Sequence, residues 1–345
     1  MIRTALSFDD VLLVPRYSAI ESRWKDTDVT GRLGDIQLDV PIISSPMDTV
    51  TGISVATAMA KMGGLGVVHR YNQAGEQEAV VRLAVSRSRT LRGPDPIIGA
   101  AVGVTGDFEA RAALLVEAGA RVICVDVAHG HHELVRRALK RLRAQLGSDV
   151  HLMAGSVATL EGFNALADWG ADSVRVGIGG GSCCSTRIRT GHGMPTLQSV
   201  LDCASSDRDA SLIADGGIRN SGDIVKALAA GADVVMVGSL LAGTTEAPGS
   251  LVRVDGQLRK TYRGMASREA QVEWRGHVAS LEGISTTVPI IGDIDDVVKD
   301  LLRGVRSGLS YSGCSTIPEL QARAQFVRQT PAGAVESAPH IDQSS

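Results

Sequence analysis

Two cysteines stand side by side in the stretch 177–187, which reads GIGGGSCCSTR. Three consecutive glycines weaken helices and strands, so the stretch is predicted to be a loop that can turn its carbonyl groups inward. Neighbouring cysteines rarely form a disulfide with each other, because the bond strains the peptide between them. A thiolate on this loop could attack an electrophilic carbon. The alternative is that Cys183 and Cys184 are two small buried hydrophobic side chains.

Two further glycine motifs could bind phosphate. The stretches 215–217 (DGG) and 238–239 (GS) each follow a short apolar run. Backbone N–H groups at such turns can surround an anion, and glycine lets the anion approach closely. The hydroxyl groups of Ser182 and Ser239 could add donors. The alternative is that these glycines only make tight turns.

Four histidines are of the residue type that binds metals: His129, His131, His132 and His192. Three of them lie on one short stretch, HGHH, without the spacing of histidine and carboxylate ligands that is typical of a zinc site. We therefore do not expect these histidines to hold a metal.

Short runs of β-branched and apolar residues alternate with segments of helical periodicity. Most runs are continuously apolar, such as residues 122–125 (VICV), which is typical of strands buried on both faces. The predicted strands are 40–44, 66–70, 97–102, 121–126, 151–154, 173–176, 211–214 and 233–237. The predicted helices are 53–62, 76–86, 108–118, 133–146, 160–169, 196–203 and 222–230.

Eight strands that alternate with helices predict right-handed βαβ units and a parallel sheet, closed as a (β/α)₈ TIM barrel of the α/β class. A doubly wound open sheet is the alternative. In such a barrel the active site lies at the carboxyl ends of the strands, and the loops after strands seven and eight commonly bind phosphate. The cysteine loop, the two glycine motifs, Ser45 and Met47 follow predicted strands, and Asp126 ends one. We therefore expect them to meet at one end of the barrel.

One domain, without an inserted regulatory domain, is expected over residues 1–328. Residues 1–39 are expected to cover the bottom of the barrel. Residues 249–300 do not continue the βα repeat and are interpreted as an insertion that forms a flap at the active site. Residues 329–345 are rich in small and polar side chains, so a flexible C-terminal tail is expected.

The composition excludes several classes of partner. The chain has 345 residues, of which 44% are apolar, so it can bury a large core. A net charge of −3 and an aromatic content of 3% favour neither nucleic acid nor a membrane surface. Five scattered cysteines fit a reducing compartment. Since there is no signal-peptide pattern and no long apolar run, we expect a cytoplasmic protein.

Several long motifs, in order along nearly the whole chain, resemble the IMP dehydrogenase/GMP reductase family. They are SFDDVLLVPRYS, PIISSPMDTVTG, GGLGVVHRYN, the GIGGGSCCSTR loop, IADGGIRNSGDIVKALAAGADVVMVGSLLAGTTEAPG and YRGMAS. The resemblance implies a purine nucleoside monophosphate as substrate, a nicotinamide cofactor and a homotetramer.

The family motif Gly-x-Gly-Ser-x-Cys-x-Thr aligns Cys184, not Cys183, with the nucleophile and Thr186 with the catalytic threonine. The resemblance further implies that Glu282 hydrogen-bonds the purine. The other implied roles are as follows: Asp215 holds the ribose; Ser182, Gly217, Gly238, Ser239 and Tyr262 surround the phosphate; Met47, Gly264 and Met265 contact the base; Asp126 and Ser45 face the cofactor; and the carbonyl groups of Gly179, Gly181 and Cys184 could hold K⁺.

Two opposite reactions at purine C2 occur in this family. The dehydrogenase oxidises IMP with NAD⁺ and needs a water-activating Arg-Tyr pair on a long mobile flap. The reductase expels ammonia from GMP and reduces the thioimidate with NADPH. Here residues 266–281, 16 in all, contain no Arg-Tyr pair, and only one helix fits between Tyr71 and Pro96, where dehydrogenases carry a regulatory insertion. We therefore predict NADPH-dependent reductive deamination, with Thr186 and Glu282 relaying the proton to ammonia.

Some motifs differ from the reductase pattern. SPMDTVTG and YRGMAS are closer to the dehydrogenase pattern, and GGG replaces Gly-Pro-Gly. The alternative is an IMP dehydrogenase in which Arg268 or Arg275 activates water. A 7-deazaguanine nucleotide, as in nucleoside antibiotic biosynthesis, is a further candidate substrate, because reaction at C2 leaves the imidazole side of the base free to change. A non-catalytic nucleotide sensor is disfavoured, because Cys184, Thr186 and Glu282 occur together.

Overall fold

The eight predicted strands form a closed parallel barrel, so the open-sheet alternative is wrong. The computed structural model describes residues 2–337. Around the barrel the strand order is β10-β11-β4-β5-β6-β7-β8-β9, and β9 pairs with β10 to close it. The barrel strands are β4 (Ile42–Ser44), β5 (Leu65–Val68), β6 (Ile98–Val102), β7 (Val122–Asp126), β8 (His151–Val157), β9 (Ser173–Val176), β10 (Ser211–Asp215) and β11 (Val234–Val237).

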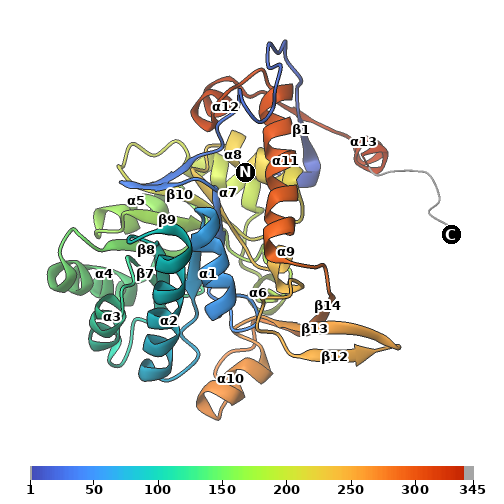
Figure 1. The fold of residues 1–345 in the computed structure, drawn as a ribbon. Helices are drawn as coiled ribbons and strands as arrows, with labels where there is room; N and C mark the ends of the chain where they lie inside the picture. Colours follow the sequence, from blue (N-terminus) through green and yellow to red (C-terminus); the bar gives the residue numbers. More distant parts are fainter. Residues whose placement is uncertain (1, 338–345) are drawn as a thin grey trace.

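Helices pack around the outside of this barrel (Figure 1). The predicted helices all form, with ends that shift by one or two residues, except that α2 continues six residues beyond its predicted end. The first seven are α1 (Ile53–Met62), α2 (Ala74–Arg92), α3 (Phe108–Glu117), α4 (Glu133–Leu146), α5 (Leu160–Asp168), α7 (Thr196–Cys203) and α8 (Ser221–Ala229). The eighth, α11 (Ile294–Tyr311), packs between α1 and α8 and was not predicted.

Local sequence explains how these helices begin, end and face the barrel. In α4 the buried residues Val135, Leu139 and Leu142 recur at helical spacing. His132 caps the N-terminus of this helix, since its imidazole accepts a hydrogen bond from the Leu134 amide at 3.0 Å. Three helices are followed by glycines in the left-handed region, Gly119, Gly170 and Gly231, at φ of 102°, 105° and 112°.

The N-terminal segment covers the bottom of the barrel, as expected. Strands β2 (Gly31–Leu33) and β3 (Ile36–Leu38) form a hairpin. Leu33 and Leu38 are fully buried and pack against the inward-facing side chains of the barrel strands. Before this hairpin, η1 (Phe8–Asp10) leads into β1 (Val11–Leu13), which pairs with β15 (Phe326–Arg328).

The insertion after β11 ends earlier than predicted. It contains the antiparallel sheet β12 (Leu251–Val254), β13 (Gln257–Arg263) and β14 (Ser285–Pro289), with α10 (Arg268–Arg275) between β13 and β14. This sheet and α10 project from the barrel (Figure 1). The predicted end of the insertion, residue 300, is wrong because it falls inside α11. The aspartates in the first turn of α11 stabilise the beginning of that helix.

Short helices complete the chain: α6 (Thr186–Thr190), α9 (Ser239–Ala242), α12 (Ile317–Arg323) and α13 (Pro331–Glu336). Helix α13 lies in the segment expected to be a flexible tail, so residues 331–336 differ from that expectation; residues 338–345 lie outside the described part. Among the described residues, no helix combines the length and apolar character needed to cross a membrane.

Candidate active site

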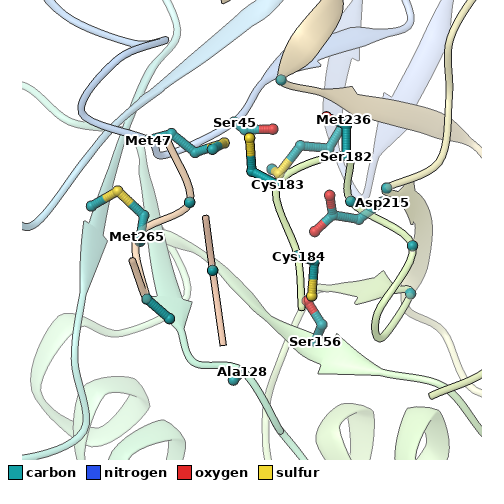
Figure 2. A pocket seen from close by; sticks show the side chains of 18 of the residues that line it. Ser45, Met47, Ala128, Ser156, Ser182, Cys183, Cys184, Asp215, Met236 and Met265 are labelled. Atoms are coloured by element: carbon teal, nitrogen blue, oxygen red, sulfur yellow. The ribbon is translucent and has the colours of Figure 1, made fainter. Parts of the chain in front are cut away.

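A cavity of about 330 Å³ opens at the carboxyl ends of the barrel strands (Figure 2). Loops that follow β4, β5, β7, β9, β10 and β11 form its wall, and the segment between β13 and β14 closes one side. The residues to which the sequence analysis gave nucleophile, proton-relay, substrate, cofactor or cation roles all line this cavity: Ser45, Met47, Asp126, Gly179, Gly181, Ser182, Cys184, Thr186, Asp215, Gly217, Gly238, Ser239, Tyr262, Gly264, Met265 and Glu282.

The cysteine loop depends on glycine at two positions for different reasons. Gly177 has φ of 150°, and a Cβ there would lie 1.9 Å from the carbonyl oxygen of Asp215, the last residue of the neighbouring strand β10. At Gly180 a Cβ would lie 2.4 Å from Thr196 Oγ1. Of the three consecutive glycines, Gly179 alone has a positive φ, 81°. Within the triplet, glycine is therefore needed at Gly180 because the loops pack closely there, and left-handed backbone requires it only at Gly179.

The two neighbouring cysteines lie in different environments. In Figure 2 their side chains leave the loop in opposite directions, Cys183 beside Ser45 and Cys184 toward Ser156. Cys184 is exposed, whereas only 3% of the Cys183 surface is accessible. Burial raises the pKa of the Cys183 thiol to about 11. Cys184 is therefore the thiol that a ligand in the cavity can reach.

A chain of hydrogen bonds connects Cys184 to a carboxylate. Cys184 Sγ lies 3.2 Å from Thr186 Oγ1, and the Thr186 hydroxyl donates to Glu282 Oε2 at 2.8 Å. The backbone holds the same groups together, since the Ser185 amide donates to the Glu282 carbonyl at 2.8 Å. Residues nearly one hundred positions apart thus form one proton path between a thiol and a carboxylate.

Small residues surround the opposite part of the cavity. Gly217, Gly238 and Ser239 come from the loops after β10 and β11, as a phosphate cradle requires. Ser182 Oγ lies 3.2 Å from the Tyr262 hydroxyl. Burial raises the pKa of Tyr262, so the hydroxyl stays neutral and can donate a hydrogen bond.

Sequence reasoning missed a buried arginine in the wall of the cavity. Arg175 Nη1 lies 2.6 Å from Asp126 Oδ1, and its Nη2 lies 2.8 Å from Asp215 Oδ2. Burial alone would lower the pKa of Arg175, but the two carboxylates outweigh it, and the pKa lies well above its usual value. The signal was present, because an arginine within an apolar barrel strand must have buried partners.

A stack of side chains beside the cavity was also missed. The Tyr71 and Trp274 rings stack with centroids 4.1 Å apart, and the Arg70 guanidinium lies 5.4 Å from each centroid. Arg70 Nε also lies 3.7 Å from Asp126 Oδ2. The stack attaches α10 to the loop after β5. Nothing in the local sequence relates Trp274 to Tyr71, so spacing alone could not reveal this contact.

The two flap arginines do not reach the cavity. Among the described residues that line it, the arginines are Arg70 and Arg175. Arg275 packs over the Trp274 ring and donates to Gln271 Oε1. The structure therefore does not bring Arg268 or Arg275 to Cys184.

Fold and site together define a (β/α)₈-barrel protein with a reachable cysteine at the centre of a polar, glycine-rich cavity. Comparison with known proteins identifies its family. Residues 5–340 match the family described as the IMP dehydrogenase / GMP reductase domain. The chain belongs to this family and is a purine-nucleotide oxidoreductase that uses a nicotinamide cofactor.

Relatives with both activities are similar to this chain. An inosine-5'-monophosphate dehydrogenase of Nitrosopumilus maritimus is 34% identical, and the alignment covers 98% of each chain. A GMP reductase of Leishmania major is 32% identical over 97% of this chain and 96% of that one. The crystal structure of a cysteine-to-alanine variant of GMP reductase from Trypanosoma brucei, in complex with guanosine 5'-monophosphate, superposes with a TM-score of 0.93. That protein is 32% identical over 99% of this chain and 98% of its own.

These alignments bear on the missing regulatory insertion. They extend over 472 positions for the dehydrogenase and 476 for the Leishmania reductase, more than the 345 residues of this chain. Relatives of both names therefore carry a segment that this chain lacks. The absence of the insertion does not separate the two activities, and the decision depends on the site itself.

Proposed function

We propose that this protein is a GMP reductase-like enzyme that removes the C2 amino group of a guanine nucleoside monophosphate with NADPH. The observation that carries the proposal is the hydrogen-bonded chain from Cys184 through Thr186 to Glu282. It can move a proton between a thiol and a departing amine without a water-activating base.

The chain accounts for every proton of the deamination step. Cys184 Sγ bonds to purine C2 while its proton passes through Thr186 to Glu282. The C2–N bond then breaks, and Glu282 returns the proton to the leaving amine, which departs as ammonia. When bound, a nicotinamide would supply the hydride that C2 takes up as the C–S bond breaks. Cys184 then leaves as a thiolate, and one proton from solvent, passed through Glu282 and Thr186, restores the thiol.

The remaining residues bind and orient the substrate in this proposal. Ser182, Gly217, Gly238, Ser239 and Tyr262 hold the phosphate. The Asp215 carboxylate holds the ribose, fixed from below by Arg175. Met47, Gly264 and Met265 contact the base, while Ser45 and Asp126 face the cofactor.

The attachment of α10 supports a reductase, because a dehydrogenase flap must enter and leave the site. Glu273 of α10 accepts from Arg263 Nη2 at 2.7 Å, and Arg263 Nε donates to Asp48 at 2.8 Å. Together with the Trp274–Tyr71 stack, this ion pair fixes α10 on two sides.

One observation favours the dehydrogenase as the second candidate. Arg70 and Tyr71, adjacent in sequence, both line the cavity. An IMP dehydrogenase built on this chain would have to activate water with this Arg70–Tyr71 pair at the end of β5, not with a pair on the flap.

The test measures absorbance at 340 nm with purified protein. NADPH with GMP, and in parallel with 7-deaza-GMP, should lose absorbance and release ammonia in equal amounts. IMP with NAD⁺ should give no XMP. NADH formation from IMP, abolished by Arg70→Met, would overturn the proposal and establish the dehydrogenase.

Two further expectations belong to this proposal. The Gly179, Gly181 and Cys184 carbonyl groups are oxygen donors of the kind K⁺ takes. The Gly181 carbonyl accepts from the Cys184 amide at 3.0 Å, which leaves its second lone pair for a cation, so K⁺ binding at these groups stays a prediction. The homotetramer implied by the family stays a prediction for sedimentation experiments.

A further inference from the structure

We propose that Gln271 is a positioning residue that holds Glu282 in place for proton transfer; the inference rests on the proposed function. Gln271 lies on α10 and only 1% of its surface is accessible. A buried amide must satisfy both its donors and its acceptor. The partners of Gln271 come from the two ends of the segment between β13 and β14.

The side chain of Gln271 holds these two ends together by hydrogen bonds. Its Nε2 donates to the Ala266 carbonyl at 3.0 Å on one end and to the Ser280 carbonyl on the other. Its Oε1 accepts from the Ala279 amide at 3.0 Å and from Arg275. Residues 276–282 contain no helix or strand, so Gln271 supplies hydrogen bonds that regular structure would otherwise supply.

Ser280 passes this restraint to the catalytic carboxylate. Its hydroxyl donates to Glu282 Oε1 at 2.8 Å, and the other oxygen of Glu282 accepts from Thr186. A continuous path of contacts therefore leads from Gln271 through Ser280 and Glu282 to Thr186. Gln271 itself does not line the cavity, so it acts through Glu282.

Replacing Gln271 with methionine tests the hydrogen bonds separately from the packing. Gln271→Met keeps the length of the side chain and removes its hydrogen bonds. A displaced carboxylate slows the chemical step and leaves the nucleotide site intact. We expect kcat to fall about tenfold or more, with the KM for the nucleotide changed less than about threefold.

Amide hydrogen exchange gives a readout that does not depend on activity. The Ser185 amide donates to the Glu282 carbonyl. Gln271→Met should therefore quicken exchange at Ser185, which lies on the cysteine loop after β9, as well as at residues 279–283. A merely structural glutamine would quicken exchange only around itself.

The matched control is Gln321→Met. Gln321 donates to the Ala232 carbonyl at 3.0 Å, just before β11 and so at the opposite end of the barrel. It should leave both kcat and Ser185 exchange unchanged. An unchanged kcat and unchanged Ser185 exchange in Gln271→Met would overturn the inference, as would equal losses in both variants. If wild-type protein lacks reductase activity, the proposed function fails by itself, and the exchange comparison still decides the role of Gln271.

Discussion

At the scale of single residues, two side chains of one chemical type are distinguished by their surroundings alone. Cys183 and Cys184 share a loop, but the first is buried beside Ser45 and the second faces the cavity and Thr186. Since a thiolate must reach its electrophile, exposure and a proton acceptor decide which cysteine can react.

This difference predicts opposite results for the two cysteines. Cys184→Ala should lower kcat by roughly a thousandfold or more, because the covalent step is lost. It should still bind the nucleotide. Cys183→Val should keep kcat within about threefold, since valine fills a buried site of similar size. Steady-state assays and nucleotide titrations measure both; a larger loss in Cys183→Val would move the nucleophile to Cys183.

At the scale of elements, Arg175 joins three strands that the sequence analysis treated separately. It lies on β9 and reaches Asp126 at the end of β7 and Asp215 at the end of β10. The carboxylates expected to face the cofactor and the ribose are therefore held in register by one guanidinium. A bidentate side chain can span both, which a single ammonium group cannot.

Arg175→Met should lower the free energy of unfolding by roughly 3–5 kcal/mol, because two buried carboxylates lose their partner. Urea denaturation measures the change. The control is Arg137→Met on α4, whose ion pair with Glu133 is exposed and should contribute less than about 1 kcal/mol. Similar small losses in both variants would mean that water satisfies Asp126 and Asp215 without the arginine.

At the scale of the whole molecule, a buried histidine at the bottom of the barrel couples stability to pH. His151 begins β8, and its Nε2 lies 2.7 Å from Ser173 Oγ. Burial lowers its pKa to about 4; the charges that face it are Asp172 and Asp35, which oppose the shift, and Arg143, which adds to it. As the pH falls, this histidine therefore takes up a proton near pH 6.5 in the unfolded chain, but only near pH 4 in the folded chain.

The stabilisation from His151 is thus fully present above about pH 6.5 and is lost as the pH falls toward about 4, amounting to roughly 3 kcal/mol at most. Urea denaturation between pH 4.5 and 7.5 measures it. His151→Gln should flatten the dependence in this window relative to wild type. An unchanged slope would assign the acid sensitivity to other groups, of which the buried His69, with a pKa also lowered by burial, is the next to replace.

The barrel could be predicted from the sequence, and so could the loops that gather at one of its ends. Apolar runs of strand length, separated by amphipathic helices, allow few other folds, and loops that follow parallel strands must gather at one end. That is why Ser45, Asp126 and Asp215 could be assigned to one cavity from the sequence, whereas the place of Glu282 came from the resemblance to a known family.

Contacts between segments that share no sequence pattern became visible only in the tertiary structure. Helix α11 could not be predicted because it begins inside residues 249–300, a segment without βα periodicity. Some side chains meet only after the barrel closes. They form the ion pairs of Arg175, the Trp274–Tyr71 stack and the hydrogen bonds of Gln271. Sequence spacing reports which residues share an element, whereas hydrogen bonds and ion pairs between elements depend on distances that only packing fixes.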